Sequence, residues 1–319
     1  MKNFFIVIFG GIFLIFFGIA IFSHDYWGLR TDLVKYFSDL ASNGVANITN
    51  AVTTPIQNSS ISGLKRYVRF TASEEESLLN AATLSLPKNY DENISAKAYL
   101  VVRLRDNKTM IEYDADRLLP IASLTKLITA SVAKKLVKDN TKVKITADIM
   151  NTFGNTAQFK IGESIMAGDL YYPLLMVSSN DAAEALARSY SRKEFIKYMN
   201  NFVQYLGAYR TTFYDPSGLS PDNRSSANDL AIIYEWVEKN YPELIDITKE
   251  KTRSTRLHVW TNPAHFLNWS NYEGGKNGYT DEALQTGIAV FHINKERYLF
   301  VVLGSHSRDQ DMIKLMKKL

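Results

Sequence analysis

The longest apolar run in the chain lies at its N-terminal end. Residues 4–22 are all apolar or glycine, and Lys2 precedes them. At ~1.5 Å of rise per residue, a helix over this run nearly matches the ~30 Å hydrocarbon core of a bilayer. A cleaved signal peptide would have a shorter apolar run and a small-residue cleavage site, which residues 21–25 do not offer. The pattern therefore predicts an uncleaved transmembrane helix within residues 1–24, with Lys2 in the cytoplasm.

Two segments with different patterns of polar and apolar residues follow this run. Residues 25–90 combine a short stretch of helical spacing with a segment rich in Asn, Ser and Thr over residues 43–62. This composition predicts a juxtamembrane segment and linker. Regular strand and helix patterns follow, so residues 91–319 are predicted to form the folded domain, outside the cytoplasm of a single-pass membrane protein.

The pattern of this domain is two strand pairs around a block of helices. The first pair is predicted at 99–105 and 109–113, and the second at 284–293 and 297–304. Apolar residues at helical spacing predict helices at 122–138, 168–177, 181–190, 192–206, 227–240 and 309–319. This order predicts an α+β fold with a central antiparallel sheet flanked by helices.

Composition narrows the chemistry. The 319 residues include no cysteine, which excludes disulfides, thiolate metal sites and a cysteine nucleophile. The five histidines are scattered without metal-ligand spacing, so no metal site and no cofactor are predicted. The net charge of +4 is small for this length and gives no reason to expect a nucleic-acid partner.

Ser123 and Lys126 form a Ser-x-x-Lys motif at the start of a predicted helix. Three residues apart on a helix, the two side chains share a face. A serine hydroxyl is a weak nucleophile that needs a base, and a lysine amine can serve when burial and a second cation lower its pKa. The motif alone is unspecific, because it also occurs at Ser62, Ser85 and Ser131. A helix cap with a solvated lysine is the alternative interpretation, but only Ser123 opens an amphipathic helix directly after a hairpin.

Two further short motifs follow in the chain. Ser178-Ser179-Asn180 lies between two predicted helices, and the alternative is that Ser178 or Asn180 only caps the second helix. Lys276-Asn277 is followed by a glycine and preceded by two more, and the alternative there is a glycine-rich turn with an exposed lysine. A phosphate-binding loop is excluded because its spacing is absent.

In this order, the three motifs resemble the set Ser-x-x-Lys, Ser-Asp-Asn and Lys-Thr-Gly, which is the signature of penicillin-binding proteins and class A β-lactamases. The stretches 119–127, 177–183, 215–219 and 275–283 resemble those of low-molecular-mass D-alanyl-D-alanine carboxypeptidases. The resemblance covers about residues 96–304 and implies a β-lactamase/transpeptidase-like fold. It implies a serine carboxypeptidase that acts on peptidoglycan stem peptides ending in D-Ala-D-Ala and is inhibited covalently by β-lactams.

The resemblance also implies catalytic roles. Ser123 would attack the carbonyl between the two D-alanines, and Lys126 would accept its proton. Ser178 would relay a proton to the leaving amine, while Asn180 would hold the substrate amide and orient Lys126. The implied substrate-binding residues are Lys276, Asn277, Gly278, Tyr279 and Thr280. The oxyanion would lie between the backbone N–H groups of Ser123 and Tyr279.

The chain departs from the family at residue 277, and alternatives to the carboxypeptidase stay open. Asn277 stands where the family has Thr or Ser, whose hydroxyl helps to bind the substrate carboxylate. A D,D-endopeptidase would use the same residues on cross-links. A non-catalytic wall-binding or sensor protein would use the same scaffold without acylation. A class A β-lactamase would need a Glu-x-x-Leu-Asn segment, which the chain lacks between Ser178 and Lys276.

Overall fold

The computed structural model describes residues 91–319. The predicted transmembrane helix at 4–22 and the predicted linker lie outside these residues, so both remain predictions. Within the described part of the chain, no helix combines the length and the apolar character needed to cross a bilayer.

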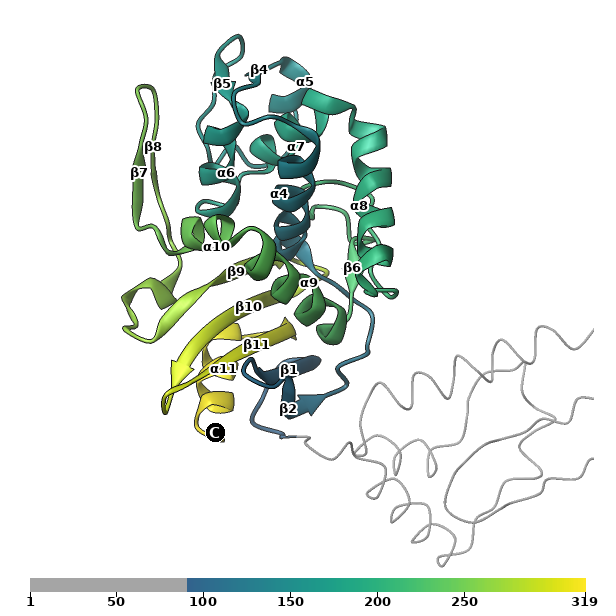
Figure 1. Ribbon diagram of the computed structural model, residues 1–319, viewed down its shortest axis with the longest axis vertical. Coiled ribbons are helices and arrows are strands. Elements are labelled where there is room, and N and C mark those ends of the chain that lie inside the picture. Colours follow the sequence, from purple (N-terminus) through teal and green to yellow (C-terminus); the bar gives the residue numbers. More distant parts are fainter. Residues whose placement is uncertain (1–90) are drawn as a thin grey trace, which may run out of the picture. The chain divides into compact units, whose positions relative to one another are not determined.

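A five-stranded antiparallel sheet forms the centre of the domain. Its strands lie in the order β2-β1-β11-β10-β9 (Figure 1). Their bounds are β1 Ala98–Arg103, β2 Lys108–Tyr113, β9 Tyr272–Thr280, β10 Leu284–Ile293 and β11 Glu296–Ser305. The first and last strand pairs of the sequence meet where β1 lies beside β11, in a register from Ala98 opposite Leu303 to Arg103 opposite Tyr298. The predicted central antiparallel sheet is therefore confirmed, with β9 at one edge.

Helices cover both faces of the sheet. The helices are η4 Ala122–Leu124, α4 Thr125–Leu136, α5 Ala147–Met150, α6 Ala167–Leu175, α7 Asn180–Tyr190, α8 Arg192–Leu206, α9 Ala227–Asn240, α10 Pro242–Lys249, η5 His265–Asn268 and α11 Arg308–Met316. Helix α11 lies on one face of the sheet, whereas α9 and α10 lie on the other, with the remaining α-helices beyond them (Figure 1).

Three short strand pairs complete the domain. They are β3 Leu119–Pro120 with β6 Arg224–Ser225, β4 Lys142–Lys144 with β5 Ser164–Met166, and β7 Thr252–Ser254 with β8 Val259–Thr261. The β3–β6 pair matters most for function, because β3 leads directly into η4 and β6 follows the loop of residues 215–223. It therefore brings two distant segments to the start of α4.

The sheet separates two hydrophobic cores. Successive side chains of a strand point to opposite faces. Leu100, Val301 and Leu303 accordingly join the large core beneath the helices. Val101 and Phe300 point the other way, into a smaller core under α11. The strands of the sheet are thus covered on both sides.

The predicted elements agree with the structure at most positions. The predicted helices at 192–206 and 227–240 have the bounds of α8 and α9. The predicted helix at 122–138 differs: it opens with the 3-10 turn η4 and stops at Leu136, because Val137 is extended. Helix α10 was not predicted. The interpretation of 274–278 as a turn is wrong, since these residues lie inside β9.

Candidate active site

Ser123 lies in the tight turn η4 at the start of α4. Ala122, immediately before it, has φ 48, in the left-handed region that non-glycine residues rarely adopt. Two glycines allow other backbone to approach this turn. A Cβ on Gly218, which has φ 89, would lie 1.9 Å from the carbonyl oxygen of Ala122. A Cβ on Gly278 would lie 2.8 Å from the backbone nitrogen of Ser123. The turn is therefore clamped between the 215–223 loop and strand β9.

Lys126 is completely buried and meets three oxygens. Its Nζ lies 2.9 Å from Ser123 Oγ, 2.7 Å from Asn180 Oδ1 and 2.6 Å from the carbonyl oxygen of Ser217. A neutral amine has two N–H donors and one lone pair. The two donors match the amide and carbonyl oxygens, which leaves the lone pair for the hydroxyl hydrogen of Ser123. The geometry accommodates an ammonium with three donors as well as a neutral amine, and the neutral amine can take a proton from serine.

The orientation of Asn180 is fixed by a second contact. Its Nδ2 donates to the carbonyl oxygen of Phe153 at 2.7 Å, so Oδ1 faces Lys126. Asn180 is the first residue of α7, but the cap of that helix is Ser179, whose side chain accepts from the Ala182 nitrogen. The capping interpretation of Ser178 and Asn180 is therefore wrong.

The electrostatics favour the neutral amine. Burial lowers the pKa of Lys126 well below its ordinary value, and the nearby Lys276 lowers it further, whereas Asp215 acts in the opposite direction. Burial, followed by the charge of Arg308, lowers the pKa of Lys276 to about 7. Burial and the neighbouring positive charge thus both disfavour protonation of Lys126.

Lys276 and Gly278 lie on the part of β9 next to η4. The Lys276 side chain is buried and its Nζ donates to the Asn277 carbonyl oxygen at 2.8 Å, so an exposed lysine is the wrong interpretation. Asn277 is half-buried. Tyr279 is 62% exposed and its hydroxyl donates to Asp281. Of the predicted substrate-binding residues, Tyr279 thus has the most open side chain.

Thr280 and Ser178 are two predicted site residues for which no contact with Lys126 is found. Thr280 Oγ1 accepts from the Ala283 nitrogen at 3.1 Å, which closes the turn after β9. Ser178 has φ 58, and its Oγ is buried without a hydrogen-bond partner in the part of the chain that the structure describes. Such a hydroxyl remains available to an incoming group.

Arg308 and Ser217 belong to this region but were not predicted from the sequence. The Arg308 guanidinium lies 2.6 Å from Asp309 and donates to the Thr286 carbonyl oxygen, beside the strand that carries Lys276. It follows β11 in the chain without any motif that would single it out. Ser217 contributes a backbone carbonyl, which no side-chain pattern reveals.

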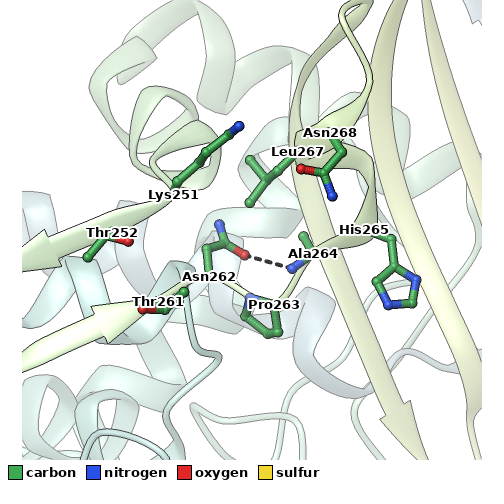
Figure 2. Close-up of a pocket in the computed structure, with 9 residues that line it drawn as sticks. All are labelled: Lys251, Thr252, Thr261, Asn262, Pro263, Ala264, His265, Leu267 and Asn268. Carbon is green, nitrogen blue, oxygen red and sulfur yellow. Dashed lines mark hydrogen bonds between the residues drawn. The ribbon is translucent and has the colours of Figure 1, made fainter.

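A separate hollow lies at the base of the β7–β8 hairpin. It has a volume of ≈ 250 Å³ and is lined by residues 251–252, 261–265 and 267–268 (Figure 2). Figure 2 shows Asn262 Oδ1 accepting a hydrogen bond from the backbone of Ala264, so this polar side chain already has a partner. None of the predicted catalytic residues lines the hollow.

Comparisons with known proteins agree on one family. The family model of peptidase S11, D-alanyl-D-alanine carboxypeptidase, matches residues 83–307, which is more than half of the chain. A D-alanyl-D-alanine endopeptidase of Haemophilus influenzae is 37% identical over 218 residues, covering 66% of this chain and 74% of the relative. The D-alanyl-D-alanine carboxypeptidase DacC of Escherichia coli is 31% identical over 233 residues, covering 67% and 57% respectively.

A solved structure gives the same result. Penicillin-binding protein D2 of Listeria monocytogenes, in its cefotaxime-bound form, superposes with a TM-score of 0.64 at 28% identity. The match covers 72% of this chain and 99% of the Listeria chain.

Proposed function

The chain belongs to the peptidase S11 family of D-alanyl-D-alanine carboxypeptidases, and on that premise we propose that Ser123 is the nucleophile with which it removes the terminal D-alanine of peptidoglycan stem peptides. The observation that carries this assignment is the set of three contacts at Lys126 Nζ, one of them to Ser123 Oγ at 2.9 Å. In the neutral form of the amine, two of the contacts use its N–H donors and the third leaves its lone pair for the Ser123 hydroxyl. Membership makes the protein a serine peptidase of the penicillin-binding class. The residue roles are our proposal.

In the proposed reaction, the Ser123 hydroxyl donates its proton to Lys126 as Oγ attacks the carbonyl carbon of the penultimate D-alanine. The tetrahedral intermediate collapses when the C–N bond breaks. The leaving amine takes a proton delivered through Ser178, whose buried hydroxyl has no competing partner among residues 91–319. Lys126 supplies that proton and becomes neutral again. Water then attacks the ester on Ser123 and gives a proton to Lys126, which returns it to Ser123 Oγ as the C–O bond breaks and the shortened peptide leaves. General acid–base catalysis of this kind contributes about 10²–10⁴-fold.

The substrate carboxylate is proposed to pair with Lys276, with Arg308 adding positive charge from behind the strand. Asn277 replaces the family's hydroxyl with an amide, which can still donate an N–H to a carboxylate. The backbone N–H groups of Ser123 and Tyr279 are proposed to stabilise the oxyanion, and one such donor lowers the barrier by about 3 kcal/mol. Strand β9 is the sheet edge, where an extended peptide can lie alongside its backbone.

A D,D-endopeptidase is the second candidate. It is favoured by the similarity to the Haemophilus influenzae endopeptidase, which is the higher of the two identities given above. The same acyl-enzyme chemistry would cut the bond between a D-alanine and the side-chain amine of a neighbouring stem peptide.

Product analysis separates the candidates. The full chain in detergent would be incubated with pentapeptide monomers and, separately, with cross-linked dimers, and the products identified by liquid chromatography and mass spectrometry. Release of D-alanine from monomers supports the carboxypeptidase, and conversion of dimers to monomers supports the endopeptidase. The Ser123→Ala variant should do neither. Turnover by that variant would contradict the assignment, and an inactive wild type would favour the wall-binding alternative.

We further propose that the domain lies outside the cytoplasmic membrane, anchored through residues 4–22, and that β-lactams acylate Ser123. The location of the family's substrate and the cefotaxime on the Listeria relative support this proposal. Deleting residues 1–24 should release an active peptidase from the membrane fraction. A deleted protein that stays bound to membranes would contradict the anchor.

A further inference from the structure

The carboxylate of Asp215 is buried and organises the 215–223 loop. Oδ1 accepts hydrogen bonds from the Ser217 nitrogen at 2.6 Å, the Ser217 hydroxyl at 2.8 Å and the Gly218 nitrogen at 2.6 Å. Oδ2 accepts from the Ser220 nitrogen at 2.6 Å. A carboxylate that accepts several backbone N–H bonds is well satisfied as an anion. The conformation of the loop therefore depends on a charged group at its centre.

The loop that this carboxylate organises holds the catalytic end of α4. The Ser217 carbonyl accepts from Lys126 Nζ at 2.6 Å, and the Pro216 carbonyl accepts from Thr129 Oγ1 at 2.6 Å. The Gly218 backbone packs against Ala122, directly before the nucleophile. One acceptor for the base and one support for the Ser123 turn thus come from residues that Asp215 binds.

The carboxylate also supplies negative charge to the same region. The charged groups that act on Lys126 are Lys276 of β9 and Asp215, and they act in opposite directions. Arg192 of α8 is paired with Glu184 of α7, and the pKa of Arg192 is raised by Glu184 and, to a smaller extent, by the charge of Asp215. The negative charge of Asp215 therefore offsets the effect of Lys276 on the pKa of Lys126.

We propose that Asp215 is a positioning residue of this peptidase: it shapes the loop that holds Lys126 and supplies the counter-charge that this amine meets. The inference rests on the proposed function, because it assigns a partner to the proposed base. It adds a role for a residue whose carboxylate hydrogen-bonds to Ser217, Gly218 and Ser220 and not to Ser123 Oγ.

The test is the pH profile of acylation in the Asp215→Asn variant. Asparagine has the same shape and keeps one oxygen acceptor but removes the charge. Without that charge the pKa of Lys126 falls further, so the neutral base is present at lower pH. The acid limb of the second-order rate constant for acylation by a fluorescent penicillin should move down by about one pH unit. The matched control is Asp222→Asn, an exposed carboxylate of the same loop, which should leave the limb in place.

A purely structural role would slow acylation equally at every pH and leave the limb unmoved, which would overturn the proposal, as would an upward shift. Asp215→Glu is the second arm, because it keeps the charge but changes the hydrogen-bond geometry. It should slow acylation without moving the limb, and a downward shift in this variant would also overturn the proposal. Failure of the proposed function is a separate result, since wild type would then carry no penicillin on Ser123.

Discussion

Two buried regions of the domain are built from opposite kinds of side chain. One is the core between the sheet and α11, and the other is the interface between α4 and the 215–223 loop. The first is apolar and aromatic, with Phe291 ringed by Phe266, Trp269, Tyr272 and Phe300. The second is polar. Its contacts are hydrogen bonds in which Lys126, Thr129 and Asn223 donate and oxygens of the partner segments accept.

The two regions use different physics. Apolar burial is non-directional and stabilises by roughly 25 cal/mol per Å². A buried hydrogen bond adds about 1 kcal/mol net, but it fixes atoms in direction and distance. We therefore expect changes under α11 to alter the free energy of unfolding, and changes between α4 and the loop to alter the acylation rate.

Lys126→Met is the strongest test of that division. It removes the amine and keeps an unbranched side chain, so acylation should slow by about 10²–10⁴-fold. Asn180 Oδ1 and the Ser217 carbonyl oxygen lose their donor, which lowers the free energy of unfolding by at most about 1–3 kcal/mol each. Methionine also removes a buried group that can carry a charge, which offsets part of this loss. Penicillin acylation kinetics and thermal unfolding would be measured together. Lys134→Met, near the far end of α4, is the control and should acylate normally. Equal acylation rates in wild type and Lys126→Met would contradict the assignment of the α4–loop contacts to catalysis.

Phe291→Ala should have the reverse profile. Phe291 is 0% exposed, and truncating a buried phenylalanine lowers the free energy of unfolding by about 3–5 kcal/mol. Acylation per folded molecule should be unchanged at low temperature, because Phe291 contacts no predicted catalytic residue. Urea denaturation measures the first quantity. Phe153→Ala truncates the same side chain at a position that is 82% exposed, and should change stability by no more than about 0.5 kcal/mol. A Phe291→Ala variant as stable as Phe153→Ala would contradict this account of the core.

The smallest expected effect is the alkaline limb of the pH profile. The pKa of Lys276 is lowered to about 7, so this amine loses its positive charge as the pH rises through that value. Pairing with a carboxylate needs the charged form, so kcat/KM should fall about tenfold per pH unit above the limb. The acid limb of the same profile reports protonation of Lys126, because this amine must be neutral to accept the proton of Ser123. A penicillin ester that lacks the carboxylate should show no alkaline limb, and an identical limb for ester and acid would remove Lys276 from carboxylate binding.

Much of the fold followed from residue patterns. Helix α8 has strong amphipathic periodicity, and the predicted bounds of both α8 and α9 are those of the structure. Strand β9 was harder to predict, because glycines at 274 and 275 weaken any strand pattern. They are needed there: a Cβ on Gly275 would lie 2.1 Å from the Ile288 carbonyl oxygen of the neighbouring strand. Helix α10 begins at Pro242, directly after α9, and its separate start was not evident from periodicity.

The site could be predicted where side chains carry it and not where the backbone does. The Ser-x-x-Lys spacing predicted the contact between Ser123 and Lys126, and the resemblance predicted that Asn180 would orient Lys126. The third acceptor of Lys126 is the Ser217 carbonyl, and every residue has a carbonyl. The left-handed φ of Ala122 occurs where the distant Gly218 and Gly278 approach its turn, and local propensity does not encode that approach.

The most direct test of the central claim is to locate the covalent adduct. The full chain would be treated with a fluorescent penicillin, digested, and mapped by mass spectrometry. We expect one adduct on Ser123, no labelling of Ser123→Ala, and normal labelling of Ser131→Ala, which removes the serine of another Ser-x-x-Lys motif on the same helix. Labelling that persists in Ser123→Ala would contradict this expectation.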